Sequence, residues 1–199
     1  MSLRPELAAI ADMIRPGTRV LDVGCGDGAL LEHLVRAKGV DGRGIEISQQ
    51  NVNACVARGL SVVQGDADTD LAEYPAGVFD AVILSQTIQA TEKPEKVLND
   101  MLRIGRRVAI SLPNFGYWKV RGSLALLGRM PRTRTLDYNW YDTPNIHLCS
   151  IDDFRALCRD MGVVVERAIV LNSKSRPIRM PPPLSNLFGE QAVFLLRRR

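Results

Sequence analysis

The chain has 199 residues, of which 46% are hydrophobic and 24% charged, a composition typical of a globular protein with a well-buried core. Its net charge of +4 does not indicate nucleic-acid binding, which needs a clustered basic face. No apolar run approaches the ~18 residues of a membrane span, and the N-terminus lacks the apolar core of a signal peptide. None of the cysteines forms a C-x-x-C pair, so we expect a cytoplasmic protein with neither a metal site nor a disulfide scaffold.

The first half of the chain alternates helical patterns with short apolar runs. Leu7, Ile10, Ala11 and Ile14 have the i, i+3, i+4, i+7 spacing of an amphipathic helix. Helical spacing returns at residues 30–35, 48–58 and 94–102, and Ser48 is expected to cap the second of these helices. Buried strands are predicted at residues 19–23, 44–47, 60–63, 79–84 and 107–112.

The C-terminal part predicts one more helix and two adjacent strands. Ser150 and Asp153 form a capping box before a helix that ends at Gly162. Strands are expected at residues 163–171 and 191–196, and the intervening loop 172–190 shows no crossover helix, so they should pair antiparallel. The whole chain thus predicts one α/β domain, residues 1–199, with a Rossmann-like doubly wound, seven-stranded, mostly parallel sheet and a C-terminal antiparallel hairpin.

Residues 113–149 form a long insertion that is rich in aromatic and basic side chains. They are Phe115, Tyr117, Trp118, Tyr138, Trp140 and Tyr141, with Lys119, Arg121, Arg129, Arg132 and Arg134. A connection of this length is uncommon unless it is functional or disordered, and its aromatic density argues against disorder. We expect a cap that is either a lid or a docking surface, with extra core as the plainer alternative.

The segment from Asp22 to Gly28, D-V-G-C-G-D-G, lies between a predicted strand and a predicted helix. Glycines there allow a tight turn and the close approach of a ligand, and the helix N-terminus supplies free N–H groups. Glu46 lies at the end of the next strand, where a carboxylate can accept hydrogen bonds from both hydroxyls of a ribose. These features predict a nucleoside site at the switch point of the sheet.

Two nucleoside ligands fit this loop. Gly24, Gly26 and Ala29 also match a loose dinucleotide fingerprint, so NAD is an alternative. Asp22, however, would repel a pyrophosphate and attract the ammonium group of S-adenosylmethionine (SAM). The missing Gly-Lys-Ser/Thr excludes a P-loop, and the terminal hairpin also favours SAM.

Together, the loop, Glu46 and the hairpin resemble the class I SAM-dependent methyltransferase superfamily. The resemblance implies that a group of eleven residues contacts SAM or its product S-adenosylhomocysteine. They are Asp22, Gly24, Cys25, Gly26, Gly28, Glu46, Ile47, Asp66, Ala67, Ser85 and Gln86. In this scheme Ile47 packs on the adenine face, Asp66 and Ala67 lie at the adenine edge, and Ser85 and Gln86 line the methionine end.

The sequence identifies a catalytic group less clearly than a cofactor site. Strand 79–84 is followed by S-Q-T-I-Q, not by the Asn/Asp-Pro-Pro-Tyr of enzymes that methylate exocyclic amino groups of bases. Gln89 cannot act as a base, which leaves His147 as the one candidate acid–base residue, with a structural role as its alternative.

The segments 84–91, 111–118 and 138–149 resemble the methionine biosynthesis protein MetW family. The resemblance implies an accessory role beside homoserine O-acyltransferase, and we expect neither a nucleic-acid nor a membrane partner. The alternative is a SAM-dependent methyltransferase whose Arg121, Arg132 or Arg134 binds a small acidic acceptor.

Overall fold

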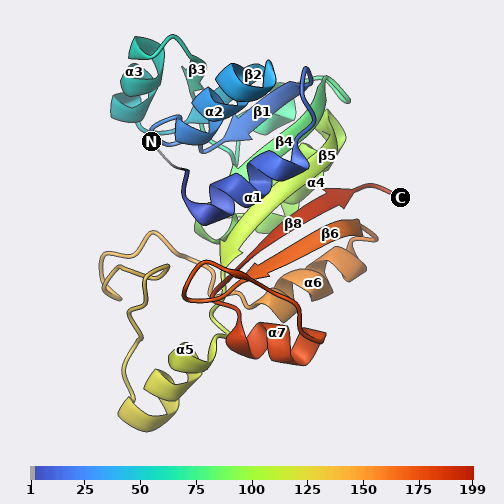
Figure 1. Cartoon of the computed structure of the whole chain (residues 1–199). Coiled ribbons are helices and arrows are strands. Elements are labelled where there is room, and N and C mark those ends of the chain that lie inside the picture. Colours follow the sequence, from blue (N-terminus) through green and yellow to red (C-terminus); the bar gives the residue numbers. More distant parts are fainter. Residues whose placement is uncertain (1–2) are drawn as a thin grey trace.

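The computed structural model describes residues 3–199, in which helices and strands alternate as far as β5 (Figure 1). The strands are β1 Arg19–Val23, β2 Asp41–Glu46, β3 Ser61–Gln64, β4 Phe79–Ser85, β5 Gly105–Pro113, β6 Val164–Leu171, β7 Pro177–Ile178 and β8 Gln191–Arg197. The α-helices are α1 Pro5–Met13, α2 Ala29–Lys38, α3 Gln49–Ala57, α4 Pro94–Ile104, α5 Trp118–Gly122, α6 Ile151–Asp160 and α7 Pro182–Phe188. The short helices are η1 Asp70–Glu73, η2 Ile88–Ala90 and the π-helical turn η3 Ser123–Leu127.

The strands form one sheet in the order β3-β2-β1-β4-β5-β8-β6-β7. Strands β1 to β5 are parallel, and β8 runs antiparallel to both β5 and β6. The predicted α/β fold, with a mostly parallel sheet and an antiparallel C-terminal end, is therefore confirmed. The chain reverses its direction of travel across the sheet between β3 and β4, so the switch point lies at the carboxyl ends of β1 and β4.

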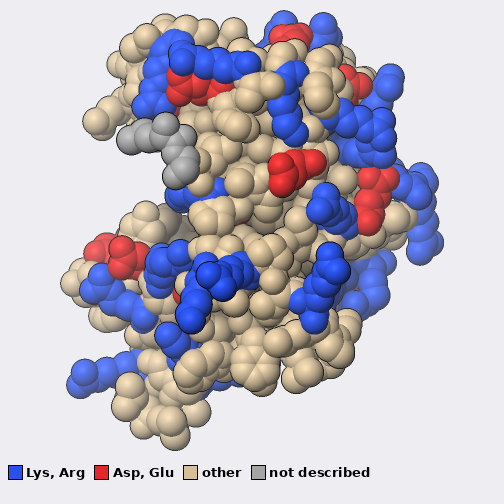
Figure 2. Space-filling model, in the orientation of Figure 1, with Lys and Arg blue, Asp and Glu red and all other residues tan. Residues whose placement is uncertain are grey.

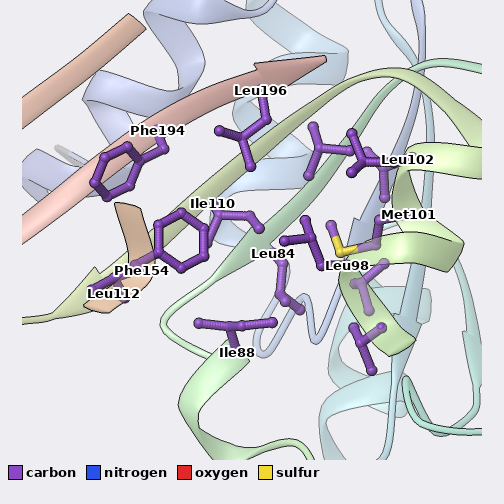
Figure 3. Packing of buried hydrophobic residues seen from close by; sticks show 14 of the residues in the cluster. Leu84, Ile88, Leu98, Met101, Leu102, Ile110, Leu112, Phe154, Phe194 and Leu196 are labelled. Carbon is purple, nitrogen blue, oxygen red and sulfur yellow. The ribbon is translucent and has the colours of Figure 1, made fainter. Parts of the chain in front are cut away.

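The core occupies both faces of this sheet, because its central strands are apolar on both sides. On one face, Phe154 of α6 packs on Phe194 of β8 with ring centroids 4.9 Å apart, in the same cluster as Leu98 and Met101 of α4 (Figure 3). On the other face, α1 and α2 cover Val193 of β8 and its neighbours. Alternate residues of β8 thus enter different clusters, as the two-residue period of a strand requires.

Two expectations about the C-terminal segment need correction. The segment 172–190 is not a plain loop, because it contains the two-residue strand β7 and helix α7, and the sheet therefore has eight strands rather than seven. Pro182 opens α7 instead of preventing a helix, because proline is compatible with the first turn, where its missing N–H is not needed. The antiparallel pairing of β6 with β8 does not depend on this difference.

The two predicted helix caps differ in outcome. Ser150 accepts a hydrogen bond from the Asp153 N–H and donates its own N–H to the Asp153 carboxylate, which confirms the capping box of α6. Ser48 occupies the N-cap position of α3, but its side chain makes no capping bond. Instead, its backbone N–H donates to Glu46 Oε1 at 3.0 Å, so Ser48 holds the predicted N-cap position without a side-chain capping bond.

Candidate ligand-binding site

The glycine loop follows β1 as a turn that only glycines adopt without strain. Gly24, Gly26 and Gly28 have φ values of 65°, 57° and 77°, in the left-handed region. The N–H groups of Gly24 and Cys25 both donate to the Ile45 carbonyl, at 2.8 and 3.2 Å, and so fasten the loop to β2. The backbone therefore turns at the carboxyl edge of the sheet and enters α2 at Ala29.

The surroundings of the three glycines differ. A Cβ on Gly28 would lie 2.8 Å from Cys55 Sγ, and one on Gly24 would lie 3.0 Å from Thr87 Oγ1. A Cβ on Gly26 would meet no atom within 4 Å. Gly24 and Gly28 therefore permit close packing within the protein, whereas Gly26 faces open space that a ligand can enter.

The side chain of Cys25 belongs to the protein core. A Cβ on Gly44 of β2 would lie 2.8 Å from Cys25 Sγ, so the thiol fills the space that this glycine leaves. Burial, with smaller contributions from Asp22 and Cys55, raises the pKa of the Cys25 thiol far above its usual range. Only the backbone of Cys25 is thus available to a ligand.

Glu46 joins the glycine loop to the start of α3. Its buried carboxylate accepts the Gly26 N–H at 2.8 Å through Oε2, and the Ser48 N–H at 3.0 Å through Oε1. The side-chain amide of Asn51, in the first turn of α3, lies 3.4 Å from Oε1. A carboxylate has about four acceptor sites, and these three donors leave Oε2 with capacity for a ligand hydroxyl.

Asp22, near the end of β1, is a buried carboxylate beside a second one. Its register partners are Gly44 of β2 and Ile83 of β4, which places it at the centre of the switch point. Desolvation by burial, and then the charge of Glu46, raise its pKa from 3.8 to about 7. An adjacent cation would favour the charged form of both acids.

Three predicted contact residues lie beyond β2 and β3. Ile47 is 65% exposed directly after Glu46. Asp66 is partly buried, accepts the Asp68 N–H through Oδ1 at 2.9 Å and donates its own N–H to Asp70 Oδ2. Ala67 is partly buried and packs against the core. The bend after β3 thus has a fixed backbone.

The residues after β4 form a second polar group at the same edge. Gln86 has φ 56°, a strained value for a residue with a side chain, and its N–H donates to Ser111 of β5. Its side-chain amide donates to Gln191 Oε1 at 3.0 Å, and Gln191 Nε2 lies 3.5 Å from Glu6 Oε2. Ser85 shares a hydrogen bond with Ser111 at 2.9 Å.

A pocket of about 360 Å³ opens beside this group, bounded by α1, the loop after β4, the start of β8 and the insertion. Its lining includes Arg4, Glu6, Gln86, Gln89, Arg134 and Gln191. Figure 2 shows this side of the molecule hollowed, with basic side chains along the lower rim. The pocket lies at the carboxyl edge of the sheet, where α/β folds hold their ligands.

The other candidate residues of the insertion lie outside this pocket lining. The His147 N–H donates to the Gln89 carbonyl at 2.9 Å, but its side chain is exposed. Arg121 donates to the Gly116 carbonyl at 2.6 Å, and Arg132 pairs with Asp137. Of the three arginines expected to bind an acidic acceptor, Arg134 alone lines the pocket.

Several residues at this edge could not be recognised in the sequence. Glu6 is buried beside the apolar positions of α1, which is unusual for an acid, but the sequence alone does not show this burial. Gln191 opens an apolar strand, and no local pattern ties it to Gln86, which lies 105 residues earlier.

Over residues 3–199, no helix combines the length and apolar character needed to cross a bilayer.

Comparison with known proteins gives one family and one fold. The family model described as "Methionine biosynthesis protein MetW" matches residues 4–196. The bifunctional methionine biosynthesis protein MetXA/MetW of Rhodopirellula baltica is 32% identical over 207 residues, which cover 100% of this chain and 33% of that protein. The fatty-acid O-methyltransferase of Mycolicibacterium smegmatis is 35% identical over 111 residues, 53% of this chain and 39% of that one. The chain thus spans about a third of the length of the curated relatives it matches.

Among solved structures, an S-adenosylmethionine dependent methyltransferase from Mesorhizobium loti superposes with a TM-score of 0.72. The match covers 98% of both chains at 16% sequence identity. At this identity the similarity concerns the fold, which is that of class I methyltransferases.

Proposed function

The chain belongs to the family of methionine biosynthesis protein MetW, and from that membership we propose that it binds SAM at the carboxyl ends of β1, β2 and β4. It is a methyltransferase-fold protein of methionine biosynthesis. In this proposal the whole chain acts as a single SAM-binding domain, and residues 113–149 form its cap.

The pair of buried acids at the switch point carries the proposal. Asp22 and Glu46 lie close enough for the charge of Glu46 to raise the pKa of Asp22. A diphosphate would add negative charge to this pair, whereas the ammonium and sulfonium groups of SAM would lower its electrostatic cost. This acid pair therefore favours SAM over NAD.

The remaining predicted residues fit around that arrangement. Glu46 would accept the ribose hydroxyls next to the open space at Gly26. Ile47, exposed after β2, would cover one face of the adenine, with Asp66 and Ala67 at its edge. The backbone of Cys25, with Ser85 and Gln86, would border the methionine end. Bound SAM would supply an activated methyl group for transfer to an acceptor.

We further propose an accessory role beside homoserine O-acyltransferase. The relative from Rhodopirellula baltica is named as a MetXA/MetW protein, so two functions share one chain there. The insertion also exposes large apolar side chains on its surface: Trp118, Leu124, Leu126, Leu127, Met130, Tyr138, Trp140 and Tyr141. Exposed apolar side chains interspersed with arginines are typical of protein interfaces.

Catalytic methyl transfer is the second candidate function, favoured by the pocket beside Gln86. Methyl transfer from a sulfonium needs mainly a held acceptor, so a polar pocket whose lining holds no histidine is compatible with it. His147 stays a predicted catalytic residue that the lining of the pocket does not support.

Two assays on the full chain separate the candidates. The accessory role predicts that the chain co-purifies with the acyltransferase and increases its activity. It also predicts that no label passes from methyl-labelled SAM to small molecules of a cell extract. Transfer of label would favour the methyltransferase, and no effect on the acyltransferase would contradict the accessory role.

A further inference from the structure

The pocket of about 360 Å³ carries balanced charge. Arg4 and Arg134 contribute two cations to its lining, and Glu6 and Asp137 contribute two anions. The side-chain amides of Gln86, Gln89, Gln191 and Asn145 add uncharged polar groups to the lining. Such a lining favours a small ligand that carries one positive and one negative charge over a dianion or an apolar molecule.

The two arginines keep hydrogen-bonding capacity. Arg134 Nη2 lies 3.7 Å from Glu190 Oε2, which is an ion pair beyond hydrogen-bond distance. Arg4 Nε lies 3.3 Å from Glu6 Oε1, and both arginine side chains are more than half exposed. Guanidinium groups present several N–H donors in one plane, and this geometry matches a carboxylate.

Gln89, which lines the same pocket, has an unpaired acceptor. Its Nε2 donates to the Gln86 carbonyl at 2.7 Å, which fixes the orientation of the amide. Its Oε1 is buried and has no hydrogen-bond partner within residues 3–199. A buried acceptor without a partner is costly, so a ligand N–H that reaches it would be bound favourably.

On the basis of the proposed function, which places SAM at the carboxyl ends of β1, β2 and β4, we infer that this pocket binds a small α-amino acid as its zwitterion. Its carboxylate would bind Arg134 and Arg4, and its ammonium would bind Gln89 Oε1 and Glu6. The Gln86–Gln191–Glu6 hydrogen bonds border both sites, so the amino acid would lie next to the methionine end of SAM.

Calorimetry on the full-length chain tests this inference in two steps. S-adenosylhomocysteine is titrated first, and that step alone tests the proposed nucleoside site. The saturated protein is then titrated with L-homoserine, with 3-aminopropan-1-ol, which lacks the carboxylate, and with 4-hydroxybutyrate, which lacks the ammonium. We expect homoserine to bind at least about tenfold more tightly than either analogue, because each loses a charge-assisted hydrogen bond.

Variants locate the binding. Arg134→Gln and, independently, Arg4→Gln should each weaken homoserine binding about tenfold or more. Arg129→Gln, a change in the same insertion but outside the pocket lining, should leave it unchanged. If S-adenosylhomocysteine binds and homoserine does not, or if 4-hydroxybutyrate binds as tightly as homoserine, the inference is wrong while the nucleoside site stands.

Discussion

At the residue scale, the raised pKa of Asp22 predicts a pH dependence of both binding and stability. A carboxyl with a pKa of about 7 keeps its proton when the protein is folded, so the free energy of unfolding should fall as pH rises from about 4 to about 7. A cationic ligand needs the charged form, so SAM affinity should rise by up to about tenfold per pH unit as the pH approaches 7 from below.

Calorimetry from about pH 5.5 to about pH 7 measures this dependence, below the range in which an α-amino group of the ligand loses its own proton (pKa about 7.7–8.0). In Asp22→Asn the group no longer titrates, so its affinity profile should be flat over this range. A wild-type profile that is equally flat would show that Asp22 does not face the cation.

The open space at Gly26 predicts a selective loss of binding. Valine there would fill the ligand's path and would also strain a backbone with φ 57° by roughly 1–2 kcal/mol. Gly17→Val is a matched control, because Gly17 also has a positive φ and a Cβ there would meet no atom within 4 Å, yet it lies outside the loop. Both variants should melt at similar temperatures without ligand, but SAM should raise the melting temperature only of Gly17→Val and not of Gly26→Val. If SAM still raised the melting temperature of Gly26→Val, the glycine loop would not be part of the SAM site.

Residues that follow a short motif could be found from sequence, and residues that depend on tertiary contacts could not. The turn from Asp22 to Gly28 and the acid Glu46 are recognisable because strand, glycines and acid keep a fixed spacing. Glu6 and Gln191 meet only because α1 packs beside the start of β8. The unpaired oxygen of Gln89 likewise depends on the bend after β4.

At the element scale, the capping box of α6 predicts a measurable loss of stability. Ser150→Ala removes the acceptor of the Asp153 N–H and should lower the free energy of unfolding by about 1 kcal/mol. Ser48→Ala is its counterpart on α3, where the serine side chain makes no capping bond, so the loss should be smaller. Denaturant unfolding compares the two, and equal losses would contradict the assignment.

The helices and strands that could be predicted from the sequence have a clear hydrophobic pattern that ends at glycine or polar residues. Strands β1 to β5 are short apolar runs closed by glycine or polar residues, and their pattern suffices to place them. Helix α7 and strand β7 were missed because a proline-rich segment without hydrophobic periodicity is typical of a loop. They form where tertiary packing and pairing with β6 override that local signal.

At the scale of the whole molecule, the proposed docking surface lies on the projecting insertion (Figure 1). Leu126 is 85% exposed and Trp140 74% exposed, and Met130 and Trp140 line one groove. The double change Leu126→Ser and Trp140→Ser should abolish co-purification with the acyltransferase without altering SAM affinity. Val56→Ser, at an exposed apolar position on α3 at the other end of the molecule, is the control. Undiminished co-purification of the double variant would place the interface elsewhere.

The acid pair at the switch point is tested most directly by calorimetric titration of the full chain with SAM and with NAD. We predict that SAM binds and NAD does not. Glu46→Gln should weaken SAM binding at least about tenfold, through loss of a charged hydrogen bond worth about 1.5–3 kcal/mol, while the exposed Glu73→Gln should not. Binding of NAD in place of SAM, or SAM affinity indifferent to Glu46, would contradict the account.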